Sequence, residues 1–335
     1  MDERDAIAAA LQAIAARIAP GGLTVDGLRR LSGGASQQTW AFALGTAGEG
    51  ALPLILRRAP GVQGPRDHGS AGLATEAALI DAARALGVPA PAVCHVLQAA
   101  DGLGEGFVMA RIEGETLGRR IVRDARFDAA RRMLARQCGQ ALARIHRVPL
   151  AGLPPLRRSG ARAELDFQIA LHRGHGTARP VFEAAFQWLR HHAPATEAAP
   201  VLVHGDFRNG NLIVGEEGLR AVLDWELAHV GDPMEDLGWL CVNAWRFGRD
   251  ELPVGGFGTH AELFDGYTAE GGTVDAERLR YWQVLGTLKW GIVCETMAHA
   301  WLSGSERELE KAVIGRRASE AEIDLLALIA PQGAA

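Results

Sequence analysis

The stretch from residue 201 to residue 240 constrains this chain more than any other part of its sequence. It places Asp206 in a loop directly after an apolar run, and Asn211 follows five positions later. A glycine-bounded turn at residues 215–218 then separates two short apolar runs, which predicts a β-hairpin that ends at Asp224. Such a hairpin would bring Asn211 and Asp224 side by side.

These residue types suit phosphoryl transfer. That reaction needs an in-line hydroxyl, a group that takes its proton, and metal ions that neutralise the phosphate oxygens. Asp206 is the candidate catalytic base, and Asn211 and Asp224 offer the hard oxygen ligands that Mg²⁺ prefers. Protein kinases have the same Asp-to-Asn spacing in their catalytic loop. We expect a supporting role for Asp236, which would accept hydrogen bonds from the backbone around His204 and hold the loop.

Three linked motifs resemble the aminoglycoside phosphotransferase family, including the subgroup found beside or fused to acyl-CoA dehydrogenases. They are His204-Gly-Asp206 with Asn211, Asp224-Trp225-Glu226, and Gly231-Asp232-Pro233 with Asp236-Leu237. A lone His-Gly-Asp is a common turn sequence, but three motifs at these spacings are specific. The resemblance implies an α+β, protein-kinase-like fold with two lobes. It also implies a kinase that uses Mg²⁺ and transfers the γ-phosphoryl group of ATP or GTP to a hydroxyl group. A cytoplasmic location is expected on separate grounds, because the sequence contains no apolar run of about 18 residues and starts with charged residues.

The pattern of extended and helical runs predicts where the two lobes divide. Short extended runs with glycine turns and one helical run, residues 74–86, are typical of a small α+β unit. From about residue 113 the periodicity is mainly helical. We therefore predict a nucleotide-covering N-lobe at residues 1–111 and a C-lobe with the catalytic loop and substrate site at residues 112–335.

The resemblance also assigns a phosphate-binding cation to the N-lobe. The family has a strand lysine there that pairs with a helix glutamate, but this chain contains only Lys289 and Lys311. Arg57 lies closest to the lysine position, and Glu76 is its expected partner. Arginine binds phosphate but is not equivalent to lysine, because its guanidinium is planar and permanently charged.

Two further N-lobe segments resemble nucleotide-binding parts of the family. Ser36 lies in a glycine-containing loop that would cover the phosphates, although an ordinary hairpin turn explains the same residues equally well. Met109 and Arg111 correspond to the hinge whose main chain meets the adenine edge. Without the resemblance, they would be the end of a buried strand.

Net charge and the length of the apolar runs limit the kinds of partner that this protein is expected to bind. A net charge of −5 gives no electrostatic reason to expect nucleic acid, and no apolar run of about 18 residues suggests a membrane span. The expected partner is a small hydroxyl compound, and the sequence indicates no particular oligomeric state.

Seven arginines occur between residues 119 and 136. A solvated face is the favoured interpretation of this segment, and a binding surface for an anionic substrate such as coenzyme A is the other. Five tryptophans are expected to pack in the core: Trp239, Trp245, Trp282, Trp290 and Trp301.

Several functions stay open. A hydroxyacyl-CoA or another small metabolite is the leading acceptor, as the resemblance to the dehydrogenase-associated subgroup implies. The C-lobe also interleaves its charges instead of clustering carboxylates for a polycation. An aminoglycoside kinase is the second candidate. A nucleotide-binding pseudokinase scaffold is favoured only by the arginine at the lysine position. A protein kinase is disfavoured, because no Asp-Phe-Gly or Ala-Pro-Glu signature follows the catalytic loop.

Overall fold

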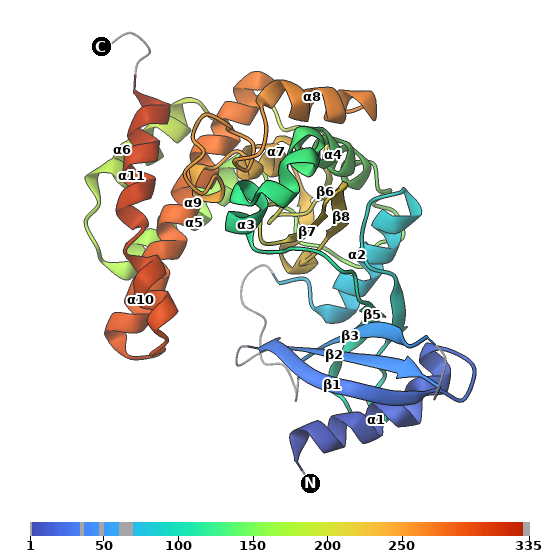
Figure 1. Ribbon diagram of the computed structural model, residues 1–335. Coiled ribbons are helices and arrows are strands. Elements are labelled where there is room, and N and C mark those ends of the chain that lie inside the picture. Colours follow the sequence, from blue (N-terminus) through green and yellow to red (C-terminus); the bar gives the residue numbers. More distant parts are fainter. Residues whose placement is uncertain (1, 34–36, 47–49, 60–69, 331–335) are drawn as a thin grey trace.

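The computed structural model describes residues 2–33, 37–46, 50–59 and 70–330, and these residues form two parts (Figure 1). The N-terminal part is an antiparallel sheet with the helices α1 (Glu3–Ile18) and α2 (Leu73–Ala85). The chain leaves this sheet at Ala110, and the part that follows is mainly helical. This is the α+β, two-lobed organisation that the sequence predicts.

The sheet has the strand order β1-β2-β3-β5-β4, and every neighbouring pair is antiparallel. The strands are β1 (Thr24–Gly33), β2 (Gln38–Gly45), β3 (Leu52–Ala59), β4 (Val93–Val96) and β5 (Glu105–Ala110). Alternation along β3 sends Leu54 and Leu56 into the core under α1. Arg57 consequently lies on the opposite face, toward α2 and the C-terminal part.

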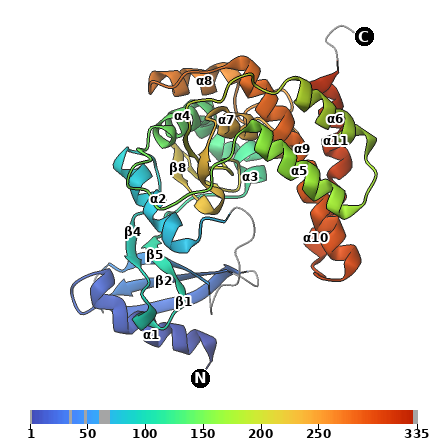
Figure 2. The same cartoon turned by 180° about the vertical axis from the view of Figure 1, so that it is seen from behind.

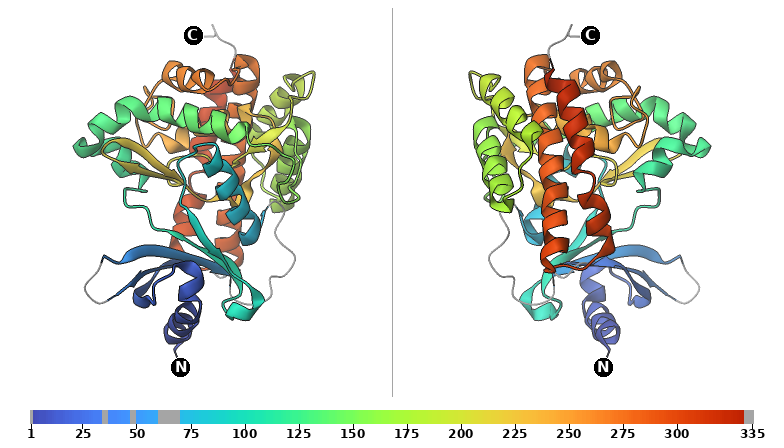
Figure 3. Two further views of the ribbon diagram at one scale, coloured as in Figure 1. Left: turned by 90° about the vertical axis from the view of Figure 1, so that its right-hand side faces the viewer. Right: turned by 90° about the vertical axis from the view of Figure 1, so that its left-hand side faces the viewer.

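The C-terminal part is built around one long helix, α9 (Ala276–Ser303), which packs against α5, α7, α10 and α11 (Figures 2 and 3). The other helices are α3 (Gly118–Arg123), α4 (Asp128–His146), α5 (Ala161–His175), α6 (Pro180–His191), α7 (Met234–Leu240), α8 (His260–Ala269), α10 (Leu309–Gly315) and α11 (Ala318–Ile329). A single cluster of buried apolar side chains runs from the α2 face of the sheet through these helices. The two parts therefore share a continuous core.

Helix α4 buries one face and exposes the other. It begins at Asp128, and its N-cap residue is Phe127. Met133 is 43% exposed, whereas Leu134 and Leu142 are buried. The contacts of α4 with α8 and with the strand β8 (Gly218–Val222) determine the buried face, and that face excludes Met133.

Two other features of the described residues bear on the sequence analysis. No described helix combines the length and the apolar character that crossing a membrane requires. All four cysteines are free; three of them are buried, and Cys94 is half-buried.

Candidate active site

Two small antiparallel pairs present the predicted site residues. β6 (Val201–Val203) pairs with β9 (His229–Gly231) and leads into the loop that carries Asp206. The predicted hairpin is present as β7 (Leu212–Gly215) and β8 (Gly218–Val222). Just beyond it, the backbone N–H of Leu223 donates to the carbonyl of Asn211 at 2.8 Å, so Asp224 follows immediately beside Asn211.

Three side-chain donors hold the carboxylate of Asp206. Its Oδ1 accepts hydrogen bonds from Trp239 Nε1 at 2.8 Å and from Arg208 Nε at 2.9 Å. Its Oδ2 accepts from Asn211 Nδ2 at 2.6 Å. Each carboxylate oxygen can accept more than one hydrogen bond, and the Asp206 side chain remains 14% exposed. The carboxylate is therefore oriented in advance and still open to a hydroxyl group.

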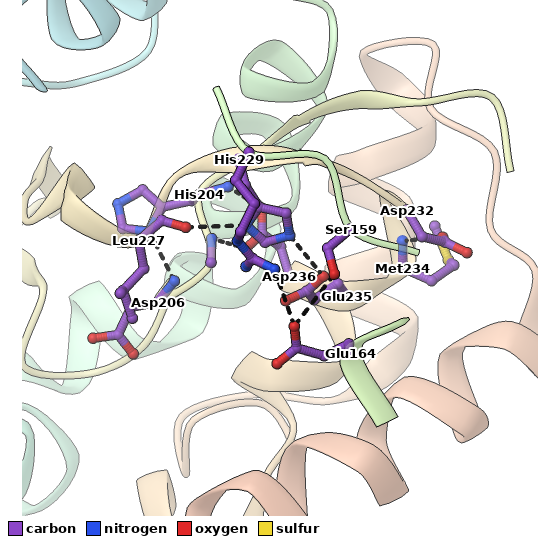
Figure 4. Close-up of polar contacts among 12 residues, drawn as sticks. Ser159, Glu164, His204, Asp206, Leu227, His229, Asp232, Met234, Glu235 and Asp236 are labelled. Carbon is purple, nitrogen blue, oxygen red and sulfur yellow. Dashed lines mark hydrogen bonds and ion pairs between the residues drawn. The ribbon is translucent and has the colours of Figure 1, made fainter. Parts of the chain in front are cut away.

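Asp236 anchors the backbone of this loop from beneath (Figure 4). Its carboxylate accepts from the N–H of His204 at 2.8 Å and from the N–H of Gly205 at 2.9 Å. Burial alone would raise the pKa of Asp236, but a hydrogen bond from His146 and the backbone donors lower it. Gly205 has φ +81°, and a Cβ there would lie 2.5 Å from the carbonyl oxygen of Leu227, so this turn requires glycine.

His204 connects the loop to the strand end beside Asp224. Its Nδ1 accepts from the backbone N–H of Asp206 at 3.2 Å, and its Nε2 lies 3.1 Å from the carbonyl oxygen of Leu223. These partners require an acceptor at Nδ1 and a donor at Nε2, which is the neutral imidazole. Burial lowers the pKa of His204, which favours the same form. The ring therefore positions the loop, and both of its nitrogens are engaged by backbone groups.

Arg57 lies between two carboxylates. Its Nη1 is 3.4 Å from Glu76 Oε2, and its Nη2 is 3.1 Å from Asp224 Oδ1. Asp224 adopts a left-handed backbone with φ 65°, a conformation that costs a non-glycine residue free energy and is concentrated at functional sites. Glu76 is fully buried, and burial raises its pKa to about 7 despite the nearby Arg57. Neither oxygen of Glu76 has a hydrogen-bond partner among the described residues.

Sequence reasoning missed two residues on this side of the site. Gln37 accepts a hydrogen bond from Arg57 Nη2 at 3.0 Å and donates to Glu226 Oε2 at 3.2 Å. Burial raises the pKa of Glu226, and the charge of Asp224 adds to this effect. Glu226 belongs to a motif that the sequence analysis singled out, but no role was assigned to it. Ser36 lies outside the described residues.

The predicted hinge residues are at the end of β5. Met109 is buried in the core, between Ile55 on β3 and Val93 on β4. The backbone N–H of Arg111 donates to the carbonyl of Pro53 at 3.0 Å, so it is committed to the sheet. The Arg111 side chain pairs with Glu113 at 3.1 Å. Nucleotide binding by Met109 and Arg111 stays a prediction.

Trp239 corrects the expectation that the tryptophans only pack. Its ring is buried, but its N–H donates to Asp206. Close packing of α7 on α9 sets this ring, because a Cβ on Gly286 would lie 3.2 Å from Trp239 Cε3. Arg208 was also missed; it lies over the ring of Trp245 at 4.6 Å while it donates to Asp206. Its position two residues after Asp206 was the available signal.

A protein-family model matches most of this chain. The model of the phosphotransferase enzyme family matches residues 27–272, which is more than half of the chain. The chain belongs to the phosphotransferase enzyme family. The matched range includes the sheet, the loop of Asp206 and the hairpin that leads to Asp224. The chain is therefore a phosphotransferase by family, and the kinases of this family phosphorylate alcohol groups of small molecules.

Solved structures show the same fold. A Ralstonia eutropha protein classed by inference as an aminoglycoside phosphotransferase has a TM-score of 0.75 at 19% identity, covering 96% of this chain and 97% of that one. A choline/ethanolamine kinase family protein from Mesorhizobium loti has a TM-score of 0.62 at 21% identity, covering 97% and 96%. The aminoglycoside phosphotransferase APH(4)-Ia, bound to AMP-PNP and hygromycin B, has a TM-score of 0.59 at 17% identity, covering 93% and 96%. The predicted kinase-like fold is confirmed.

The curated relatives are acyl-CoA dehydrogenase family members, whereas the solved structures above belong to phosphotransferases and kinases. Mouse acyl-CoA dehydrogenase family member 10 is 30% identical over 197 residues, covering 56% of this chain and 18% of that protein. Chicken acyl-CoA dehydrogenase family member 11 is 29% identical over 227 residues, covering 63% and 27%. The chain thus spans roughly a fifth to a quarter of the length of these relatives.

Proposed function

We propose that this phosphotransferase is an active kinase that transfers the γ-phosphoryl group of ATP to the hydroxyl of a small metabolite, with Asp206 as the base. The arrangement around Asp206 carries the proposal. Its carboxylate is fixed by Trp239, Arg208 and Asn211 and remains partly exposed. A carboxylate held in this way can accept the proton of an alcohol and orient its oxygen for in-line attack.

The residues beside Asp206 fit Mg²⁺. Asn211 uses its amide nitrogen to hold Asp206, and none of its hydrogen bonds among the described residues occupies the amide oxygen. Asp224 has one oxygen on Arg57, and its side chain is 34% exposed. One amide and one carboxylate oxygen are typical of a magnesium site that phosphate oxygens complete. When bound, Mg²⁺ would neutralise the charge that develops on the phosphate oxygens.

Arg57 and Glu76 are proposed to hold the nucleotide phosphates from the N-terminal sheet, with Gln37 as a further partner of Arg57. The guanidinium already lies at the boundary between the two parts, where it contacts Asp224. Binding of a nucleotide would require Arg57 to divide its donors between phosphate and Glu76. Ser36, Met109 and Arg111 complete the proposed nucleotide-binding residues by resemblance.

A hydroxyacyl-CoA is the proposed acceptor. The acyl-CoA dehydrogenase relatives favour it, and Arg208, which contacts Asp206, is a cation that could meet an anionic compound. A site for a polycationic aminoglycoside would instead need clustered carboxylates facing the substrate. The arginines of residues 119–136 give this assignment little support, because Arg120 and Arg126 pair with Glu115.

A pseudokinase scaffold is the second candidate, and one observation favours it. The 3.1 Å contact between Arg57 and Asp224 occupies part of the carboxylate that is proposed to bind the metal. If this ion pair persisted with nucleotide present, the protein would bind ATP weakly and transfer nothing.

Steady-state phosphorylation of 4-hydroxyacyl-CoA thioesters and of kanamycin-type aminoglycosides by one preparation tests the acceptor. We expect a higher kcat/KM for the thioesters. A higher value for the aminoglycosides would overturn the acceptor assignment and leave the kinase chemistry in place. Nucleotide binding without product formation from either substrate would favour the scaffold.

A further inference from the structure

A pocket of about 330 Å³ opens between α5 and α9, next to the loop of Asp206. We call it the α5–α9 pocket; the residues that matter here are Arg157, Glu164, Phe167, Leu171, Leu227 and Lys289. Leu227 connects it to the catalytic loop, since a Cβ on Gly205 would lie 3.3 Å from Leu227 Cβ. Leu227, on the wall of the pocket, thus lies beside Gly205, the residue before Asp206. Figure 2 shows α5 and α9 side by side.

Lys289 lies where this pocket meets the support of Asp206. Its side chain lines both the α5–α9 pocket and a smaller adjoining recess that is bounded by Trp239 and Gly286. The ammonium lies over the Trp239 ring, 5.0 Å from the ring centroid. The N–H of that same ring donates to Asp206 Oδ1. A single indole thus separates the Lys289 ammonium from the proposed catalytic base.

The carboxylates around Lys289 already have other partners. Glu164 accepts from Gln168 at 3.0 Å and lies 3.3 Å from Arg157. Glu235 lies 3.1 Å from His229, a contact that Figure 4 shows together with the nearby Glu164. Within the described part of the chain, no carboxylate lies at ion-pair distance from Lys289, although its charge helps to lower the pKa of Glu164 against the effect of burial.

Entry of a substrate would remove water from the Lys289 ammonium. If the substrate gave the ammonium no new partner, this loss of hydration would cost free energy. Contact with an aromatic face compensates only part of the lost hydration, because a cation–π contact is worth about 0.5–2 kcal/mol. A negatively polarised oxygen on the ligand would complete its coordination. The apolar side chains of Phe167, Leu171 and Leu227 would contact the carbon chain of that ligand.

We propose that Lys289 determines acceptor specificity by binding the acyl oxygen of a hydroxyacyl substrate whose hydroxyl group contacts Asp206. The ligand chemistry is an oxygen acceptor, either a free carboxylate or a thioester carbonyl, separated from the hydroxyl by about the width of an indole ring. The rest of the acyl compound lies in the α5–α9 pocket. This inference rests on the proposed function, since it concerns the acceptor side of the same site.

The test compares Lys289→Met with wild type on three matched acceptors: 4-hydroxypentanoate, its CoA thioester, and 1,4-pentanediol as the neutral compound. Loss of a hydrogen bond from a charged donor costs about 10- to 100-fold. We expect a loss of that size in kcat/KM, mainly through KM, for the acid or the thioester, and a loss at least tenfold smaller for the diol. Lys289→Arg should restore part of the preference because it keeps the charge. Lys311→Met, which removes the only other lysine, is the matched control and should change none of the three values.

The two possible oxygens give different results. A loss confined to the free acid identifies a carboxylate ligand, and a loss for the thioester identifies its carbonyl oxygen; either supports the proposal. Equal losses for the diol and the acyl compounds would overturn it, because they would mean that Lys289 acts only through the position of Trp239 and Asp206.

A binding measurement separates this inference from the proposed function. Calorimetry with 4-oxopentanoate and its CoA thioester, which lack the hydroxyl group, needs no turnover. Weaker binding to Lys289→Met than to wild type supports the inference even if no acceptor is phosphorylated. Equal binding by both proteins, or no binding of either compound to wild type, contradicts it, whatever the kinase activity.

Discussion

The two carboxylates at the centre of the site, Asp206 and Glu76, are held in opposite ways. Asp206 receives three side-chain hydrogen bonds, and its loop is tied down by Asp236. Glu76 is buried, has no hydrogen-bond partner among the described residues, and relies on Arg57 at 3.4 Å. A fully paired carboxylate keeps its geometry without a ligand, whereas a buried carboxylate with one ion pair depends on charge balance. We call the residues around Asp206 the catalytic half of the site, and Glu76 with Arg57 the nucleotide half. The catalytic half is therefore preorganised, whereas the nucleotide half is sensitive to pH and to its binding partners.

Asp224 belongs to both halves, because it contacts Arg57 and is a proposed metal ligand beside Asp206. Its removal should therefore have the largest effect. Asp224→Ala removes the only anionic ligand proposed for the metal and one of the two carboxylates on Arg57. We expect it to abolish the gain in nucleotide affinity that Mg²⁺ provides, as measured by calorimetry with and without the ion. Asp265→Ala, an exposed position on α8, is the control. Unchanged magnesium-dependent affinity in Asp224→Ala would remove this residue from the metal site.

Asp206→Asn tests the preorganised half alone. The amide has the same shape but cannot take a proton, so we expect turnover to fall by about 10²–10⁴ while nucleotide affinity stays nearly constant. Steady-state kinetics and nucleotide titration of the same preparation give both values. Near-full turnover by the purified variant would exclude Asp206 as the base.

Glu76→Gln tests the other half through the pH dependence of stability. Folding raises the pKa of Glu76 from 4.5 to about 7, so the folded protein binds this proton more tightly than the unfolded chain does. The associated stability is present below about pH 4.5 and is lost as the pH rises through 7, amounting to about 3 kcal/mol. Denaturant unfolding at pH 5 and pH 8 should show this loss in wild type and not in Glu76→Gln.

The control for that experiment is Glu310→Gln, which removes an exposed carboxylate on α10 and should keep the wild-type pH dependence. If Glu76→Gln and wild type lost the same unfolding free energy between the two pH values, Glu76 would be ionised throughout. The contrast with Asp206 would then fail.

Trp239→Phe should have the smallest effect, since it removes one of the three donors to Asp206 and leaves most of the ring packing. We expect kcat to fall about 10-fold, the cost of one hydrogen bond to a charged group. Trp301→Phe, a half-exposed position near the end of α9, serves for comparison. Equal kcat values for Trp239→Phe and wild type would show that two donors suffice to orient the carboxylate.

Separation along the chain explains which contacts of the site the sequence could predict. Asp206, Asn211, Asp224 and Asp236 lie close together along the chain, so one hairpin and one helix start determine their meeting, and local patterns predict both. The contact of Asp236 with the backbone of His204 and Gly205 was predicted for this reason.

Residues that reach the site through tertiary packing gave no comparable signal. Trp239 contacts Asp206 because α7 packs closely on α9 at Gly286, and its spacing along the sequence resembles that of any core tryptophan. Gln37 meets Glu226 across 189 positions of sequence. Lys289 lies on α9, whose partners only the folded structure reveals. Arg57 was predicted through family resemblance and not from its residue type.

Phosphoryl transfer itself is the most direct test of the account. Wild-type protein would be incubated with ATP and a panel of hydroxyacyl-CoA thioesters, with and without Mg²⁺, and the products followed by phosphorus NMR. The account predicts a phosphate monoester on the acceptor hydroxyl that forms only with Mg²⁺ and disappears in Asp206→Asn. Nucleotide binding without transfer to any hydroxyl compound, including water, would contradict it and identify the protein as a scaffold.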